Sequence, residues 1–165
     1  MAKRGYRGKH PHNDAKVSKH SESTDKRNPK LQAEYDNLHS KQKYSFIRDH
    51  QGFFPQATAT IVCHASNDDD ETIVIISTDG TSKTYTGKDA GDDASAGEFN
   101  TGGNAAAAAT GLQSCIEHAN GHAGKITVSK DSATLTLTQR DPGPDGNTTI
   151  TSGLTGGSAT SFTGG

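Results

Sequence analysis

A few side chains of this 165-residue sequence have types and spacings that could bind a metal ion. The acidic run Asp68–Glu71 offers several carboxylates. Adjacent residues of a turn point in different directions, so we interpret the run as a solvated turn. Asp141 and Asp145 have the spacing that begins a calcium-binding loop. The twelfth position of that loop is Ser152 in place of the bidentate Glu, so we reject a calcium site.

Two other patterns invite a functional interpretation. His118 and His122 are four residues apart, which suits a zinc pair on a helix, but Gly121 breaks the helix between them. A histidine near a helix C-terminus is favoured by the helix dipole alone. The stretch Thr101–Asn104 precedes a predicted helix, where phosphate can bind, yet no Gly-Lys-Ser/Thr follows it. We predict no metal, no cofactor and no catalytic residue, and we expect that the protein is not an enzyme.

The two cysteines, Cys63 and Cys115, are not in CxxC spacing and do not make a disulfide framework. We interpret them as buried thiols. Whether they are bonded stays open, because a disulfide requires Cα atoms about 5.5–6 Å apart. No apolar run follows Met1, and none approaches the ~18–20 residues of a membrane span. We therefore expect a soluble protein without a signal peptide, made in a cytoplasm and without membrane contact.

Charge divides the sequence into two parts. Residues 1–50 hold 12 Lys and Arg against 6 Asp and Glu, a net charge of +6, and residues 51–165 hold 5 against 13, a net charge of −8. This asymmetry favours a basic arm that meets an acidic surface, nucleic acid or the body of a neighbouring copy, with a solvated tail as the alternative. The sequence has no groove-reading motif, so we expect no direct contact with nucleic acid.

The first part of the chain has little to bury. Residues 1–30 are polar and have no apolar period, so we expect them to be disordered on their own and to order only against partners. A short helix is predicted by the spacing of Leu31, Tyr35 and Leu38. An apolar cluster that could anchor the arm onto the domain or onto a neighbour comprises Phe46, Ile47, Phe53 and Phe54. We divide the chain into a basic extended arm, 1–56, and a β-rich domain, 57–165.

Alternation of apolar and polar residues predicts strands from Ala57 onward. The stretch 72–77 is apolar on both faces, which is typical of a central strand. Asp79-Gly80 is the sharpest hairpin signal of the chain. The predicted strands are 57–65, 72–77, 82–86, 125–129 and 133–138, with short edge strands at 148–151 and 159–163.

One helix is predicted after a Gly- and Asp-rich loop at 87–103. Asn104 can cap it, an apolar stripe of mostly Ala side chains runs along it, and Asn120-Gly121 can end it. The predicted fold class is α+β: one small, mainly antiparallel β-sheet with one Ala-rich helix packed on it, preceded by a long extended N-terminal arm.

Four pieces of the domain, in order, carry a resemblance to a known family. They are an opening strand at 57–62, a hairpin at 72–85, an Ala-rich helix at 104–120, and a closing hairpin, loop and tail at 133–139, 142–150 and 162–165. In these pieces the chain resembles a β-rich module recurrent in virion structural proteins of tailed bacteriophages, both decoration or cement proteins and tail-associated ones. The resemblance implies a virion component and supplies no catalytic residues.

The resemblance and the arm together predict a capsid decoration, or cement, protein that stabilises contacts between major capsid subunits. The alternatives are a tail, neck or baseplate protein, or the host-binding module of a fibre or spike. We expect the partners to be the major capsid protein or other virion proteins, and copies of the chain itself. The residues predicted to bind partners are Lys3, Arg4, Arg7, Lys9, Lys26, Arg27 and Lys30, which are basic, and Phe46, Phe53 and Phe54, which are apolar anchors.

Overall fold

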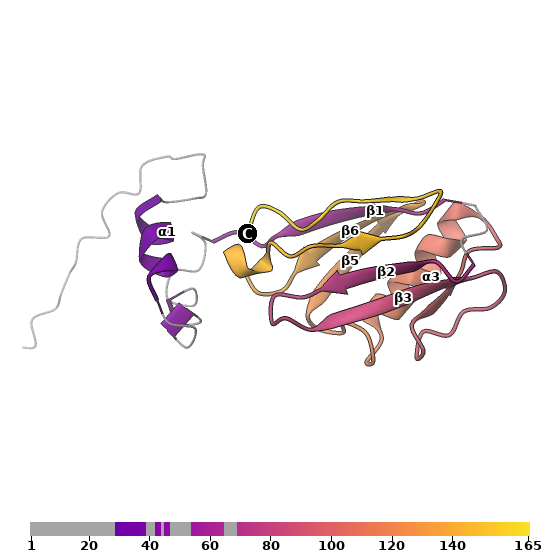
Figure 1. The fold of residues 1–165 in the computed structure, drawn as a ribbon, viewed down its shortest axis with the longest axis horizontal. Helices are drawn as coiled ribbons and strands as arrows, with labels where there is room; N and C mark the ends of the chain where they lie inside the picture. The colour runs from indigo at the N-terminus through magenta and orange to yellow at the C-terminus, as the bar shows by residue number, and fades with distance from the viewer. Residues whose placement is uncertain (1–28, 39–41, 44, 47–53, 65–68) are drawn as a thin grey trace, which may run out of the picture.

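A computed structural model describes residues 29–38, 42–43, 45–46, 54–64 and 69–165 (Figure 1). The helices are α1 (Pro29–Asp36), α3 (Ala105–Glu117) and the short 3₁₀ helix η1 (Pro144–Gly146). The strands are β1 (Thr58–Val62), β2 (Thr72–Ile76), β3 (Ser82–Lys88), β4 (Glu98–Asn100), β5 (Ile126–Asp131), β6 (Thr134–Gln139), β7 (Thr151–Ser152) and β8 (Ser158–Ala159).

The eight strands form two four-stranded sheets that share one core. Their orders are β5-β6-β1-β8 and β4-β3-β2-β7. In Figure 1 the first sheet lies above the second, with α3 at the end away from α1. Helix α3 contacts β4 and β5, one edge strand of each sheet, and β7 contacts β8 at the opposite edges. The core between the two sheets is therefore closed by α3 along one pair of edges and by the β7–β8 contact along the other pair.

Period-two alternation explains the first sheet. Strand β1 buries Ala59 and Ile61 and exposes Thr58 and Val62. Ile61 lies opposite Leu135 of β6, so both side chains enter the same core. Since successive side chains of a strand point to opposite faces, a slip of one residue would expose this apolar row, and the alternation fixes the register.

The β2–β3 hairpin forms where Asp79-Gly80 predicted it. Gly80 has a φ of +80°, a conformation that glycine adopts without steric cost. The Asp79 carboxylate accepts hydrogen bonds from the Ser77 hydroxyl at 2.6 Å and the Thr81 N–H at 3.0 Å. Hydrogen bonding to Ser77 and the Lys125 ammonium holds the pKa of Asp79 far below its usual range. The turn is thus held by an ionised side chain.

Helix α3 begins as the sequence predicts. The Asn104 side chain accepts a hydrogen bond from the Ala107 N–H at 2.9 Å, which satisfies a donor of the first turn. The helix ends at Glu117, three residues before the predicted stop. His118 is already extended, and its N–H donates to the Cys115 carbonyl at 3.3 Å. The residues that α3 buries are Ala108, Ala109, Gly111, Leu112, Cys115 and Ile116.

The structure confirms the α+β class and the central position of β2, and it corrects three details. There are two sheets where the sequence predicted one. The segment 87–103, predicted to be a loop, contains β4, which pairs parallel with β3. The two edge strands are shorter than predicted and shifted, as β7 and β8 show. Strands of two or three residues are too short to display an alternating pattern, and β4 has one apolar side chain, Phe99.

Candidate functional site

Three aromatic side chains near the start of the described chain pack on one another, and we call this cluster of Tyr35, Phe46 and Phe54 the aromatic anchor. Tyr35 of α1 is completely buried, and its ring centroid lies 5.5 Å from that of Phe54 and 6.5 Å from that of Phe46. The Lys43 ammonium lies 4.5 Å from the Tyr35 ring centroid. Aromatic pairs of this kind each contribute about 0.5–1.5 kcal/mol beyond their buried area.

A polar contact ties the aromatic anchor to the domain. The Tyr35 hydroxyl donates a hydrogen bond to the Asp145 carboxylate, 110 residues away in sequence, at 2.5 Å. Asp145 belongs to η1, which lies at the end of the domain nearest α1 (Figure 1). The Asp145 carboxylate, which the sequence analysis weighed as a calcium ligand, therefore accepts a hydrogen bond from a residue of α1. The structure places the start of the described chain at one defined end of the molecule.

The predicted partner-binding residues are only partly within the described chain. Lys30 lies on α1 and is exposed, Phe46 is half-buried, and Phe54 is buried. Phe46 and Phe54 pack on each other with ring centroids 6.0 Å apart, so these two arm residues belong to one aromatic cluster within the arm. That these residues bind a partner protein stays a prediction. The residues that lie outside the described ranges are Lys3, Arg4, Arg7, Lys9, Lys26, Arg27 and Phe53.

The described part of the acidic run is engaged within the fold. Asp69 accepts a hydrogen bond from the Asp89 N–H at 3.1 Å, and Asp70 pairs with the Lys88 ammonium. Glu71 accepts hydrogen bonds from the N–H and hydroxyl of Thr155. Among the described residues, no group of three or more His, Cys, Asp and Glu side chains is placed to hold a metal ion. Nor does any helix there have the length and apolar character required to cross a membrane.

His122, which the sequence analysis considered and rejected as a zinc ligand, is a buried structural group. Its side chain is completely buried, and its Nε2–H donates to the Thr81 carbonyl at 3.2 Å. A carbonyl can only accept, so Nδ1 is the acceptor for the Tyr85 hydroxyl at 2.6 Å. Burial lowers the pKa of His122 and raises the pKa of Tyr85. Both shifts favour the neutral forms, so this pair holds β3 to the turn after α3 without carrying charge.

We expect the buried His122 to make stability depend on pH. Its folded-state pKa lies below the unfolded value of 6.5, so the stability it contributes is present above pH 6.5 and is lost as pH falls toward the folded pKa. Between pH 7.5 and 5.5 the free energy of unfolding should fall by about 1 kcal/mol. Urea unfolding across this range should show a flatter dependence for His122→Gln, whose amide can keep both hydrogen bonds. His118→Gln, at a half-exposed position, is the control, and an unchanged slope in His122→Gln would contradict the assignment.

The cysteines are separate and buried, which answers the question the sequence left open. The Cys115 thiol donates to the Glu98 carbonyl at 3.3 Å. Burial, with nearby carboxylates of lesser effect, raises its pKa to about 12. The thiolate is the reactive form of cysteine, so Cys115 is an inert core residue.

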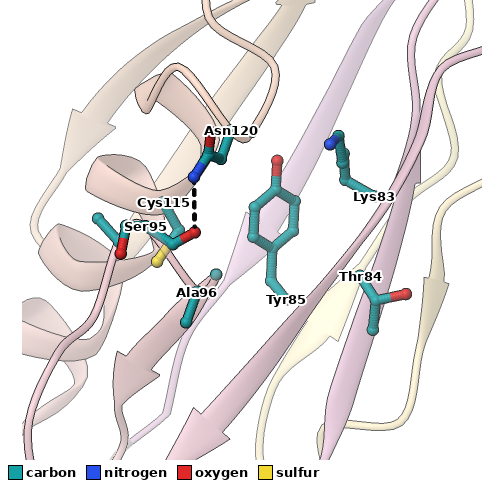
Figure 2. A pocket seen from close by; sticks show the side chains of 10 residues that line it. Lys83, Thr84, Tyr85, Ser95, Ala96, Cys115 and Asn120 are labelled. Carbon is teal, nitrogen blue, oxygen red and sulfur yellow. Dashed lines mark hydrogen bonds between the residues drawn. The ribbon is translucent and has the colours of Figure 1, made fainter.

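A cavity of about 240 Å³ opens beside Tyr85 (Figure 2). One wall is formed by Lys83 to Tyr85 of β3, and the other by the loop 94–97. The end of α3 and the turn Asn120-Gly121 close it. In Figure 2 the Lys83 and Asn120 side chains lie on either side of the Tyr85 ring. The cavity is thus a short groove between a strand and a loop.

The loop wall of this groove is fixed by hydrogen bonds. The Asp93 carboxylate accepts from the Ser95 hydroxyl at 2.6 Å and from the Ser95 and Ala96 N–H groups. These bonds, the one from the Ser95 side chain foremost, lower the pKa of Asp93. The Asn120 amide donates to the Ser95 carbonyl at 3.0 Å and so ties the loop to the end of α3. The groove is therefore preformed.

Comparison of the chain with models of protein families, with curated proteins and with solved structures gave no match. Sequence reasoning found the helical spacing of Tyr35 but not its contact with Asp145, and no sequence signal connects Tyr85 with His122.

Proposed function

We propose that the chain is a structural component of a tailed-phage particle, and specifically a capsid decoration protein that stabilises contacts between major capsid subunits. One observation carries this proposal: the basic segment starts from a fixed point at one end of a compact acidic domain. That point is the aromatic anchor, where Tyr35 is buried and hydrogen-bonded to Asp145.

The length and charge of the preceding segment suit a bridge between subunits. Residues 1–28 carry 8 Lys and Arg against 3 Asp and Glu, a net charge of +5. Fully extended, 28 residues span at most about 100 Å, enough to reach beyond the area that a small domain covers on a surface. Individual exposed ion pairs contribute only about 0–1 kcal/mol, so attachment requires many of them acting together.

The resemblance of residues 57–165 to a module of virion proteins supports the same proposal. It also leaves the tail, neck or baseplate as the second location, because the module recurs in tail-associated proteins. A decoration protein binds at every capsid lattice position of one kind, whereas a tail or neck ring holds a fixed, small number of copies.

Copy number distinguishes these locations. The chain should be counted against the major capsid protein in purified particles by quantitative mass spectrometry with isotope-labelled peptides. We expect on the order of hundreds of copies per particle, as multivalent decoration of a lattice requires. A ring-like number on the order of ten would move the protein to the tail or neck, and its absence from particles would refute a virion role.

A further inference from the structure

The turn after α3 contains the sequence's one Asn-Gly pair, Asn120-Gly121. In such a pair no side chain of the second residue shields its main-chain nitrogen, which can attack the carbon of the Asn side-chain amide. Asn120 is exposed, so its side chain is open to water. The fold requires glycine at the second position, because a Cβ there would lie 2.1 Å from the Cys115 carbonyl oxygen. The reactive pair is therefore built into the turn.

The Asn120 side chain also holds a neighbouring loop. Its Nδ2 donates to the Ser95 carbonyl at 3.0 Å, the hydrogen bond drawn in Figure 2. The loop 94–97 is held as well by the Asp93 carboxylate, which accepts from the Ser95 and Ala96 N–H groups. A carbonyl can only accept, so the bond to Ser95 exists only while residue 120 carries an amide. Loss of that amide would free the loop on the side of α3.

We propose that Asn120 is a site of spontaneous deamidation and that its conversion to an acidic residue releases the loop 94–97. The Gly121 nitrogen forms a bond to the side-chain carbon of Asn120, the bond from that carbon to Nδ2 breaks, and the proton of the Gly121 nitrogen leaves with Nδ2 as ammonia. Water then opens the succinimide at either carbonyl, which gives aspartate or isoaspartate at position 120. The inference goes beyond particle attachment and does not depend on it.

Two hydrogen bonds engage the reacting groups in the folded turn. The Gly121 N–H donates to the His118 carbonyl at 2.8 Å, and the Asn120 amide donates to Ser95. Both bonds must open before the Gly121 nitrogen can attack, so the reaction takes place in a locally opened form of the turn. Exposed turns are among the parts of a fold that open at the lowest free energy. The rate of conversion therefore reports how often this turn opens.

The product of the reaction cannot restore the contact with the loop. A carboxylate at position 120 has no N–H for the Ser95 carbonyl, so two acceptors would face each other. Asp93 also contacts Ser95, and its hydrogen bonds, the one from the Ser95 hydroxyl foremost, lower its pKa, so it is ionised. A second negative charge against the same residue adds like-charge repulsion. We therefore expect the loop to open more often after conversion.

The first test follows deamidation in the full-length folded chain, incubated at mildly alkaline pH and analysed by peptide mapping with mass spectrometry. The control positions are the other described asparagines that precede Thr or Ala, namely Asn100, Asn104 and Asn147. Acid and isoaspartate should accumulate at Asn120 at least about tenfold faster than at these controls, because only Asn120 precedes glycine. Conversion at Asn120 that is no faster than at the controls would overturn the proposal.

A variant of the loop tests whether opening limits the rate. Asp93→Ala removes the carboxylate that holds Ser95 and Ala96 and should raise the rate of conversion at Asn120 about tenfold. Asp131→Ala, at an exposed position of β5, is the matched control and should leave the rate unchanged. An unchanged rate in folded Asp93→Ala would contradict the release of the loop. If that variant does not fold, the comparison of Asn120 with the three control asparagines still decides.

The second test places the acidic product directly in the turn. In Asn120→Asp, hydrogen exchange followed by NMR should be about tenfold faster at the Ser95 and Ala96 amides than in the parent chain, with the core of β1 unchanged. Asn147→Asp, which loses a bond to the Gly165 carbonyl instead, is the control and should leave the loop amides as they are. Equal exchange of these amides in Asn120→Asp and the parent chain would overturn the proposal.

Discussion

A chain that lacks residues 1–28 will keep its folded domain and its aromatic anchor and will fail to decorate particles. The deletion removes a net charge of +5 and leaves Tyr35 in place on Asp145. Loss of multivalent contacts should weaken attachment by about 100-fold or more, because each contact alone is weak. Occupancy is measured by mixing purified chain with particles that lack it, followed by sedimentation and quantitative gel analysis.

Two variants separate charge from chain length in this experiment. A Gly/Ser segment of 28 residues in place of residues 1–28 keeps the length, and a glutamine variant keeps the length while changing the net charge of this segment from +5 to −1. The cations replaced by Gln in the second variant are Lys3, Arg4, Arg7, Lys9, Lys26 and Arg27. Both variants should attach as poorly as the truncated chain. Full occupancy by the truncated chain would show that the arm is dispensable.

The largest effect on stability is expected for Gly121→Ala. A Cβ at this position would lie 2.1 Å from the Cys115 carbonyl oxygen and 2.9 Å from that of Ile116. These are backbone atoms of the last turn of α3, and they cannot withdraw without disturbing the hydrogen bond from His122 N–H to Ile116 O at 2.7 Å. Overpacking of this kind should cost about 3 kcal/mol, which corresponds to a Tm lower by about 10 °C.

Gly103→Ala is the matched control for this substitution. A Cβ there would meet nothing nearer than the Ala107 Cβ at 3.8 Å, an ordinary contact. We expect its urea midpoint to stay the same or to rise slightly, since alanine reduces the entropy of the unfolded chain. If the Gly121→Ala and Gly103→Ala variants unfold at the same urea concentration, the result would contradict the close approach of Gly121 to the Cys115 carbonyl oxygen.

The parts of the fold that the sequence predicted correctly are those with a local signal. The alternation in β1, the Asp79-Gly80 turn and the Asn104 cap each depend on residues close together in the chain. Each of these patterns reflects a local conformational preference, and the structure contains the strand, the turn and the helix cap that the patterns predict. The two-sheet arrangement depends on which strands become neighbours, and β1 pairs with β8 about 100 residues later. Alternation specifies a buried face but not the partner strand.

The candidate site was harder to predict for the same reason. The spacing of Tyr35 places it on a helix, whereas its hydroxyl meets Asp145 only because the folded domain presents η1 there. The groove lies between β3 and the loop 94–97, where β4 has not yet begun its pairing at Thr86, a fact of register that composition does not encode. The sequence analysis rejected zinc at His122 but gave no sign that His122 is hydrogen-bonded to Tyr85 in the core.

The central claim is that the basic arm acts by binding to its neighbours in a particle. Hydrogen exchange of the amides of residues 2–28, followed by mass spectrometry, tests it directly when the free chain is compared with the chain attached to particles. Attachment should slow the exchange of these amides by about 100-fold or more while leaving the core strands β1 and β2 unchanged. The same exchange rates for residues 2–28 in both states would contradict the claim.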